Sequence, residues 1–86
     1  MTVTMNASDR IDLSGICPAE DAEILLQHLL AHPDAAIDWR GCETAHSAVV
    51  QVLMAARRAM LGTPAGTFIR VFVAPALARR SEFDLP

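Results

Sequence analysis

Ser47 is the residue of this chain whose type and surroundings best suit a defined chemistry. It follows the segment 36–46, Ala-Ile-Asp-Trp-Arg-Gly-Cys-Glu-Thr-Ala-His, and precedes the apolar run Ala-Val-Val-Gln-Val-Leu. This pattern predicts a short buried strand, a tight loop and a helix with Ser47 in its first turn. A hydroxyl there lies beside unpaired backbone N–H groups and the positive end of the helix dipole. A phosphate at that point would be tolerated and would change the local charge by roughly −2, which is the layout of a phosphorylation switch. The simpler interpretation is a helix-start serine that bonds only to nearby backbone.

Cys42 and His46 are four residues apart, a spacing that would suit a thiolate–imidazole pair or half of a metal site. A structural zinc site needs four ligands, and no anchoring pattern surrounds His28 and His32. A Cys–His enzyme also needs an oxyanion site and a substrate cleft, for which so small a domain has little room. We therefore expect no enzymatic activity, no metal and no cofactor. Cys17 and Cys42 form no Cys-x-x-Cys motif and are expected to be reduced and half-buried.

The elements that position Ser47 are expected to form one small domain spanning residues 1–86. Its 52% hydrophobic content suits a packed core, but no apolar run approaches the ~20 residues of a membrane-spanning helix. The N-terminus lacks the features of a signal peptide, so a cytoplasmic location is expected. The net charge of −3 argues against nucleic-acid binding. Five arginines could meet an acidic partner, although solvated faces are the commoner role of such residues: Arg57, Arg58, Arg70, Arg79 and Arg80.

The first half of the chain predicts a hairpin, a helix and a central strand. Alternating residues indicate strands at 2–5 and 10–13, joined by the turn cluster 6–9. Pro18 suits the first position of a helix that His32-Pro33 ends. The apolar segment 35–39 predicts a central strand that ends at Trp39, a core residue or a partner anchor.

The second half predicts a helix, a strand and a short final helix. The helix runs over 45–61, with Thr44 as its N-cap and Gly62 ending it in the left-handed conformation. Segment 68–73, Phe-Ile-Arg-Val-Phe-Val, is the clearest strand pattern, and a helix at 75–80 and a tail at 81–86 follow. The order is therefore β-β-α-β-α-β-α, which predicts an α/β fold with helices packed on a small mixed sheet.

Three segments together resemble the STAS domain, named for sulfate transporters and anti-sigma-factor antagonists. Ile-Asp-Leu-Ser-Gly at 11–15, with the leucine helix after it, is similar to the family's strand, glycine and first helix. Segment 37–49 is similar to its strand and switch loop, where the family typically reads Asp-Ser-Ser-Gly or Asp-Ser-Ala-Gly. Segment 71–77 is similar to its last strand and following helix. The resemblance covers most of the chain and implies a STAS-like fold.

The resemblance also implies a function. Antagonists of this family bind a serine kinase that is itself an anti-sigma factor, and phosphorylation of a serine in the switch loop controls the complex. Ser47 stands at that position, with His46 in place of the family's aspartate and Val49 in place of its glycine. Because glycine permits close approach of a partner backbone, valine implies a changed or lost docking surface. Protonated imidazole would still favour a neighbouring phosphate, and could equally make phosphorylation unnecessary.

We therefore expect a non-enzymatic regulatory domain that binds a protein partner, with neither nucleic-acid binding nor membrane insertion. The partner would be a serine kinase that docks on the loop and the start of the second helix. The residues expected to meet it are Arg40, Gly41, Glu43, Thr44, His46 and Val50. Arg40 would pair with Glu43, the commoner case, or with a phosphate on Ser47. The alternatives are a constitutive accessory subunit that binds a transporter ATPase, and a homodimer through the apolar helix 45–61.

Overall fold

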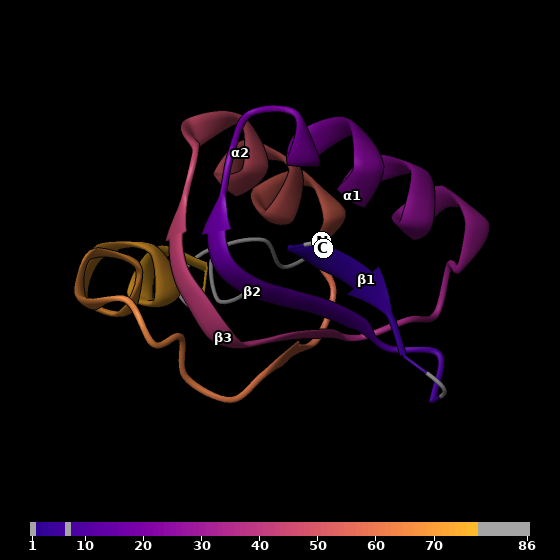
Figure 1. Cartoon of the computed structure of the whole chain (residues 1–86). Coiled ribbons are helices and arrows are strands. Elements are labelled where there is room, and N and C mark those ends of the chain that lie inside the picture. Colours follow the sequence, from indigo (N-terminus) through magenta and orange to yellow (C-terminus); the bar gives the residue numbers. More distant parts are fainter. Residues whose placement is uncertain (1, 7, 78–86) are drawn as a thin grey trace.

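Four strands form one mixed sheet in the order β1-β2-β3-β4. The computed structural model describes residues 2–6 and 8–77, in which β1 (Val3–Met5) pairs antiparallel with β2 (Ile11–Cys17) as the predicted hairpin requires. β2 runs parallel to β3 (Ile37–Ala45), and β3 runs parallel to β4 (Met60–Leu61). Figure 1 shows β2 and β3 as the long strands at the centre of the molecule.

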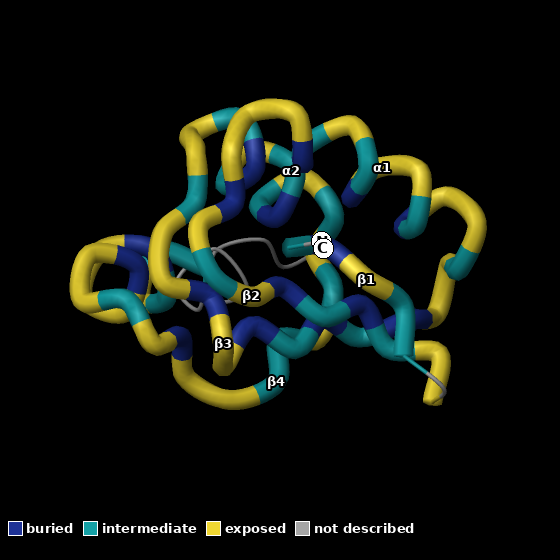
Figure 2. The backbone as a smooth tube through the Cα atoms, in the orientation of Figure 1, coloured by how far each residue is buried: buried dark blue, intermediate teal, exposed yellow. Residues whose placement is uncertain are grey.

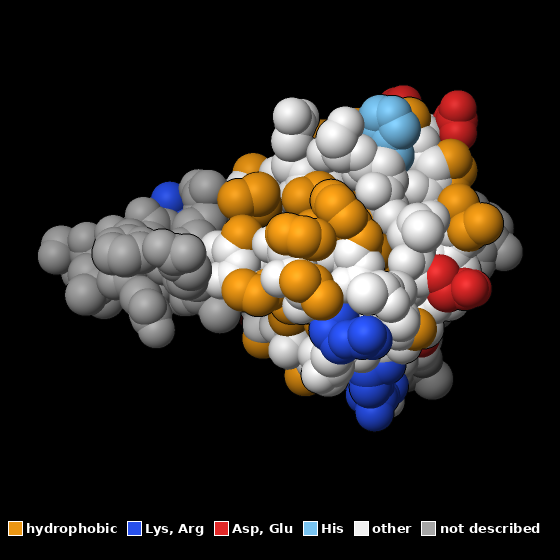
Figure 3. Space-filling view, turned by 90° about the vertical axis from the view of Figure 1, so that its left-hand side faces the viewer, with side chains coloured by type: hydrophobic (Ala, Val, Ile, Leu, Met, Phe, Trp, Pro, Cys, Tyr) orange, Lys and Arg blue, Asp and Glu red, His pale blue; other side chains and the backbone are white. Residues whose placement is uncertain are grey.

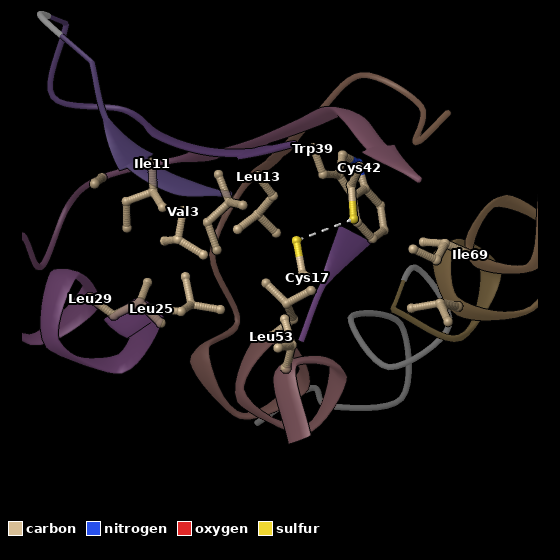
Figure 4. Close-up of a cluster of buried hydrophobic side chains, with 14 residues drawn as sticks. Val3, Ile11, Leu13, Cys17, Leu25, Leu29, Trp39, Cys42, Leu53 and Ile69 are labelled. Carbon is tan, nitrogen blue, oxygen red and sulfur yellow. Dashed lines mark hydrogen bonds between the residues drawn. The ribbon is translucent and has the colours of Figure 1, made fainter. Parts of the chain in front are cut away.

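Helices α1 (Asp21–Ala31) and α2 (Ser47–Ala56) lie together over one face of the sheet (Figure 1). Each helix connects two parallel strands, which need such a crossover because a tight turn cannot join them. Buried positions recur along β2 and β3 (Figure 2), and their side chains meet both helices in one core (Figure 4). The core includes Ile11, Leu13, Leu25, Leu29, Ile37, Trp39, Val49 and Leu53. The predicted α/β class and the order β-β-α-β-α-β-α are confirmed.

The other face of the sheet carries polar side chains. Thr4, Asp12, Ser14, Asp38 and Arg40 line a shallow hollow of about 280 Å³ there. Only one face of the sheet therefore builds the core of the described residues, which explains the alternation in the first two strands.

Several elements begin or end where the sequence does not predict. α1 begins at Asp21 rather than Pro18, because a turn with a hydrogen bond from Asp21 N to Pro18 O precedes it. β3 runs to Ala45, since residues 41–45, predicted as a tight loop, pair with β2 through contacts such as Ser14 with Gly41. The loop expected before Ser47 is therefore mostly strand.

α2 ends at Ala56, well before the predicted Leu61, and Gly62 does not terminate it. Arg57 follows the helix with the left-handed dihedrals φ 54° and ψ 42°. Arg58 then donates three hydrogen bonds to carbonyl groups at the end of α1, and Met60–Leu61 pairs with β3 as β4. These long-range contacts explain why the chain leaves the helix early, although its residues favour continuation.

The predicted strand at 68–73 is wrong. This segment is helical, with a π-helix, η1 (Ile69–Val73), between α-helical residues 67–68 and 74–77. Ile69 and Val73, four residues apart, are buried, and Ile69 points toward Trp39 and Cys42 (Figure 4). β-branched and aromatic residues favour strands, but contacts made at helical spacing with the core outweigh that preference here. The fourth strand of the predicted order is β4 (Met60–Leu61) instead.

The outward side of the last helix is apolar. Phe68, Val71 and Phe72 are exposed by 66%, 52% and 64%, and the rings of Phe68 and Phe72 lie 5.0 Å apart. In a view of the side that carries η1, apolar side chains gather over the middle of the face, with arginine side chains beside them (Figure 3). The helix predicted at 75–80 is described to Leu77 as a continuation of this element, and the remainder and the tail 81–86 lie outside the described residues.

Candidate functional site

Ser47 is the first residue of α2 and is exposed, as the sequence predicts for a modifiable hydroxyl. It follows β3 after a single residue, His46, so the serine lies at the carboxyl end of a parallel strand. The first turn of α2 contains no acidic side chain. The positive end of the helix dipole therefore meets no acidic side chain within this turn, and it favours an anion there.

His46, not the predicted Thr44, is the N-cap of α2. Its Nδ1 accepts a hydrogen bond of 3.0 Å from Ala48 N, and its carbonyl accepts hydrogen bonds from Val49 N and Val50 N. Its own N–H donates to Cys17 O at 2.8 Å, which ties the start of α2 to the end of β2. An aspartate carboxylate performs the same capping in many helices, so the imidazole at this position replaces a capping acceptor with another.

Val49 lies in the core, with 0% of its surface exposed. The valine side chain therefore points away from the outer surface at the start of α2. Val50, the next residue, is half-buried and borders that surface. A glycine-to-valine difference at position 49 would change the packing under the helix, and not the surface that a partner meets.

Arg40 pairs with Asp38, and not with Glu43. Its Nε and NH2 groups donate to the two carboxylate oxygens of Asp38 at 3.0 and 2.6 Å, and its backbone N–H donates to Asp38 Oδ1 at 3.1 Å. Arg40 also precedes Ala45 by five residues of extended strand, roughly 16 Å at ~3.3 Å per residue. An arginine held at that distance does not reach a phosphate on Ser47.

The Arg40–Asp38 pair predicts a pH-dependent signal. Hydrogen bonds from Arg40 lower the pKa of the Asp38 carboxyl to about 2. In the unfolded chain the pKa of an aspartate is ~3.9. The ionised Asp38 therefore contributes fully to the free energy of unfolding above that pH, and this contribution is lost as the pH falls toward 2. In carboxyl-detected NMR titrations we expect a midpoint near 2 for Asp38. Arg40→Gln should move this midpoint up toward ~3.9. A midpoint that Arg40→Gln leaves unchanged would show that the pair does not form.

The remaining predicted partner residues lie on β3 before α2. Gly41, Glu43 and Thr44 are all exposed, Gly41 opposite Ser14 on β2 and Thr44 opposite Ile16. Glu43 lies against the backbone of the segment that leads to η1, because a Cβ at Gly66 would come 1.6 Å from Glu43 O. The structure thus brings Glu43, Thr44, His46 and Ser47 to one end of the sheet, with Arg40 farther along the strand.

An apolar groove runs between α1 and α2 and begins beside Ser47. Its volume is about 580 Å³, and its lining includes Ala48, Val52, Leu26 and Leu30. Leu26 and Leu30 are exposed by 45% and 74%. The leucines of α1 therefore extend beyond the core: Leu25 and Leu29 are buried, whereas Leu26 and Leu30 are exposed and line the groove beside α2.

Cys42 lies against Cys17 and makes no pair with His46. Both thiols are free and fully buried rather than half-buried, and their Sγ atoms are 4.0 Å apart (Figure 4). Sequence reasoning missed this contact because the two cysteines are separated by 25 positions. The parallel pairing of β2 and β3, which a single sequence indicates only weakly, brings them together.

The other polar candidates have local structural roles. His32 Nδ1 lies 3.8 Å from the Asp9 carboxylate. Arg58, predicted as a candidate for binding an acidic partner, donates hydrogen bonds to carbonyl groups of the chain itself. Arg79 and Arg80 lie outside the described residues. Among residues 2–6 and 8–77, no three side chains of His, Cys, Asp or Glu gather as metal ligands would. Within the same residues, no helix combines the length and the apolar character needed to cross a bilayer.

An exposed serine at the start of α2, a capping histidine and an apolar groove lie together at one end of the sheet. A functional assignment therefore depends on these three features. Comparisons of the chain with protein-family models, with curated proteins and with solved structures find no match.

Proposed function

We propose that this protein is a non-enzymatic regulatory domain, similar to the anti-sigma-factor antagonists of the STAS family, that binds a serine kinase and is switched by phosphorylation at Ser47. The observation that supports this proposal most strongly is the exposure of Ser47 at the first position of α2, directly after a parallel strand. A kinase can reach such a hydroxyl without unfolding the domain, and the helix start accommodates the added charge.

The two departures from the family's switch loop are compatible with this proposal. His46 caps α2 through Nδ1, so the helix start keeps an acceptor where the family has aspartate. Val49 is buried beneath the helix, so it does not obstruct a partner that approaches Ser47 from outside. Neither difference removes the surface on which a kinase would dock.

The docking surface in this proposal combines the end of β3 with the apolar groove. Glu43, Thr44 and His46 supply polar groups around Ser47, and Ala48 leads into the groove where Leu26 and Leu30 are exposed. Interfaces of this kind gain affinity from a desolvated apolar centre and specificity from a polar rim. A phosphate on Ser47 would lie where the polar residues meet the apolar groove, and its charge would lose water there without a compensating partner, which weakens binding.

The first experiment compares partner binding by wild type and by a phosphate mimic at Ser47. Tagged wild type, Ser47→Glu and the control Ser8→Glu, which places the same charge at another exposed serine, are used to capture proteins from native cells. We expect wild type and Ser8→Glu to capture a serine kinase. For Ser47→Glu we expect affinity for that kinase to fall 10- to 100-fold, a loss of about 1.4 to 2.8 kcal/mol.

Incubation of the purified chain with the captured kinase and ATP completes the test. Mass spectrometry should find one phosphate, on Ser47, and none on the Ser47→Ala variant. Equal capture of one partner by wild type and Ser47→Glu would contradict the switch and would favour the constitutive accessory-subunit alternative. Capture of the chain alone, with concentration-dependent mass in light scattering, would favour the homodimer.

A further inference from the structure

Two thiols face one another inside the molecule and have no part in the proposed partner surface. Cys17, at the end of β2, and Cys42, in β3, are each exposed by only 1%, and their sulfur atoms are 4.0 Å apart. One dashed contact joins them within the core in Figure 4. Each sulfur also lies near a backbone carbonyl of its own strand, Cys17 near Ser14 O at 3.8 Å and Cys42 near Thr44 O at 3.6 Å.

The environment of the pair distinguishes the two thiols chemically. A hydrogen bond from Cys42 lowers the pKa of the Cys17 thiol, because it stabilises the thiolate more than burial destabilises it. The same contact, with burial, raises the pKa of Cys42. Cys17 is therefore the better nucleophile, and Cys42 is placed to follow it, since redox-active cysteines combine an activated thiol with a resolving thiol nearby.

We propose that Cys17 and Cys42 are a redox-sensitive dithiol, which hydroperoxides oxidise to an intramolecular disulfide. The sulfur atoms must approach by about 2 Å to reach the bond length of ~2.0 Å, so closure requires rotation or displacement of the two cysteines, at the end of β2 and within β3. Hydrogen peroxide is small and uncharged, which suits a pair that is buried among apolar side chains. Reduction by small thiols or thioredoxin-type proteins reverses the reaction.

The reaction proceeds in two balanced steps. The Cys17 thiolate attacks one oxygen of the peroxide, the S–O bond forms, the O–O bond breaks, and the leaving hydroxide takes up the proton released by Cys17 as water. Cys42 then attacks the sulfur of the Cys17 sulfenic acid, the S–S bond forms and the S–O bond breaks, with the Cys42 proton leaving in a second water molecule. The two thiols lose two electrons in total, and the peroxide gains them.

Backbone contacts connect this pair to the start of α2. Cys17 O accepts the hydrogen bond from His46 N at 2.8 Å, and Cys42 O accepts one from Gly66 N at 3.0 Å. Displacement of the backbone at Cys17 therefore acts on the cap residue next to Ser47, and displacement at Cys42 acts on the segment that leads to η1. The oxidation itself does not depend on phosphorylation or on a partner, so its failure and the failure of the proposed function are separate results.

The test uses the purified full chain, reduced and then treated with hydrogen peroxide under native conditions. After free thiols are blocked with N-ethylmaleimide, intact mass spectrometry should show a monomer that has lost two hydrogen atoms and carries no label. Peptide mapping should link Cys17 to Cys42, and dithiothreitol should restore two labelled thiols. In amide NMR spectra, the signals of His46 and Gly66 should shift on oxidation more than that of Leu30, an exposed residue near the C-terminal end of α1 that makes no contact with either cysteine in the core.

Single variants assign the two roles. In Cys42→Ser, which keeps a hydrogen-bond donor beside Cys17 but no resolving thiol, dimedone should label Cys17 as a persistent sulfenic acid, at least tenfold more than it labels Cys42 in Cys17→Ser. If either variant fails to fold by circular dichroism, the linked peptide from wild type decides the question. Unchanged thiols, over-oxidised single cysteines or only intermolecular disulfides in wild type would overturn the proposal. A disulfide that leaves the His46 amide signal unmoved would overturn its connection to α2.

Discussion

Replacing Gly66 by alanine is expected to lower the free energy of unfolding by about 3 kcal/mol, at the upper end of what overpacking costs. A Cβ at this position would come 1.6 Å from Glu43 O and 2.5 Å from the Glu43 carbonyl carbon. Both atoms belong to the backbone of β3, so no side-chain rotation relieves the clash. The substitution would also break the hydrogen bond from Gly66 N to Cys42 O, since the strand and the segment must separate.

Urea unfolding followed by the fluorescence of Trp39, the single tryptophan, measures this effect. Gly41→Ala is the matched control, because a Cβ at Gly41 meets only the Ser14 side chain closely, at 3.2 Å. We expect it to change stability by less than about 1 kcal/mol. If Gly66→Ala proved as stable as Gly41→Ala, the close approach of residue 66 to β3 would be refuted. Because Glu43 borders the start of α2, the Gly66 variant should also weaken partner binding if the proposed surface is correct.

The second large effect is expected at Arg58. Arg58→Ala should destabilise the protein by about 2–3 kcal/mol, since hydrogen bonds that involve a charged group are among the strongest that side chains make. The guanidinium donates to His32 O at 2.8 Å, to Ala35 O at 3.0 Å and to Leu29 O at 2.8 Å. It therefore satisfies a carbonyl group in the last turn of α1 and two just beyond the helix, where a positive charge also interacts favourably with the negative end of the helix dipole.

Two further arginine variants separate the geometry of this contact from its charge. Arg58→Lys keeps the charge but replaces a planar fork by a single ammonium, so we expect it to recover less than half of the lost stability. Arg70→Ala removes an exposed arginine with one hydrogen bond of 3.3 Å to Ala65 O, and should cost less than ~0.5 kcal/mol. Equal unfolding midpoints for Arg58→Ala and Arg70→Ala would show that Arg58 does not stabilise the end of α1.

The sequence alone determined those parts of the fold that depend on neighbouring residues. The hairpin of β1 and β2, the existence of α1 and α2 and the α/β class follow from local hydrophobic patterns and turn residues. The predicted order is also found, with β4 as its last strand in place of segment 68–73. The position of Ser47 in the first turn of α2 was also predictable, because a strand pattern stops and a helical pattern starts around it. For the site, the sequence thus indicated the serine and its neighbours in the chain.

Contacts between distant residues decided the rest. Residues 68–73 have strand-forming side chains, yet they are helical because Ile69 and Val73 fit the core at helical spacing and β4 already occupies the edge of β3. α2 ends early because Arg58 binds the end of α1, and the Cys17–Cys42 pair exists because β2 and β3 run parallel. Local preferences are worth tenths of a kcal/mol to ~1 kcal/mol per residue, whereas buried side chains and charge-assisted hydrogen bonds each contribute more. Where the two conflict, the tertiary structure prevails, and a single sequence does not reveal which distant residues will meet.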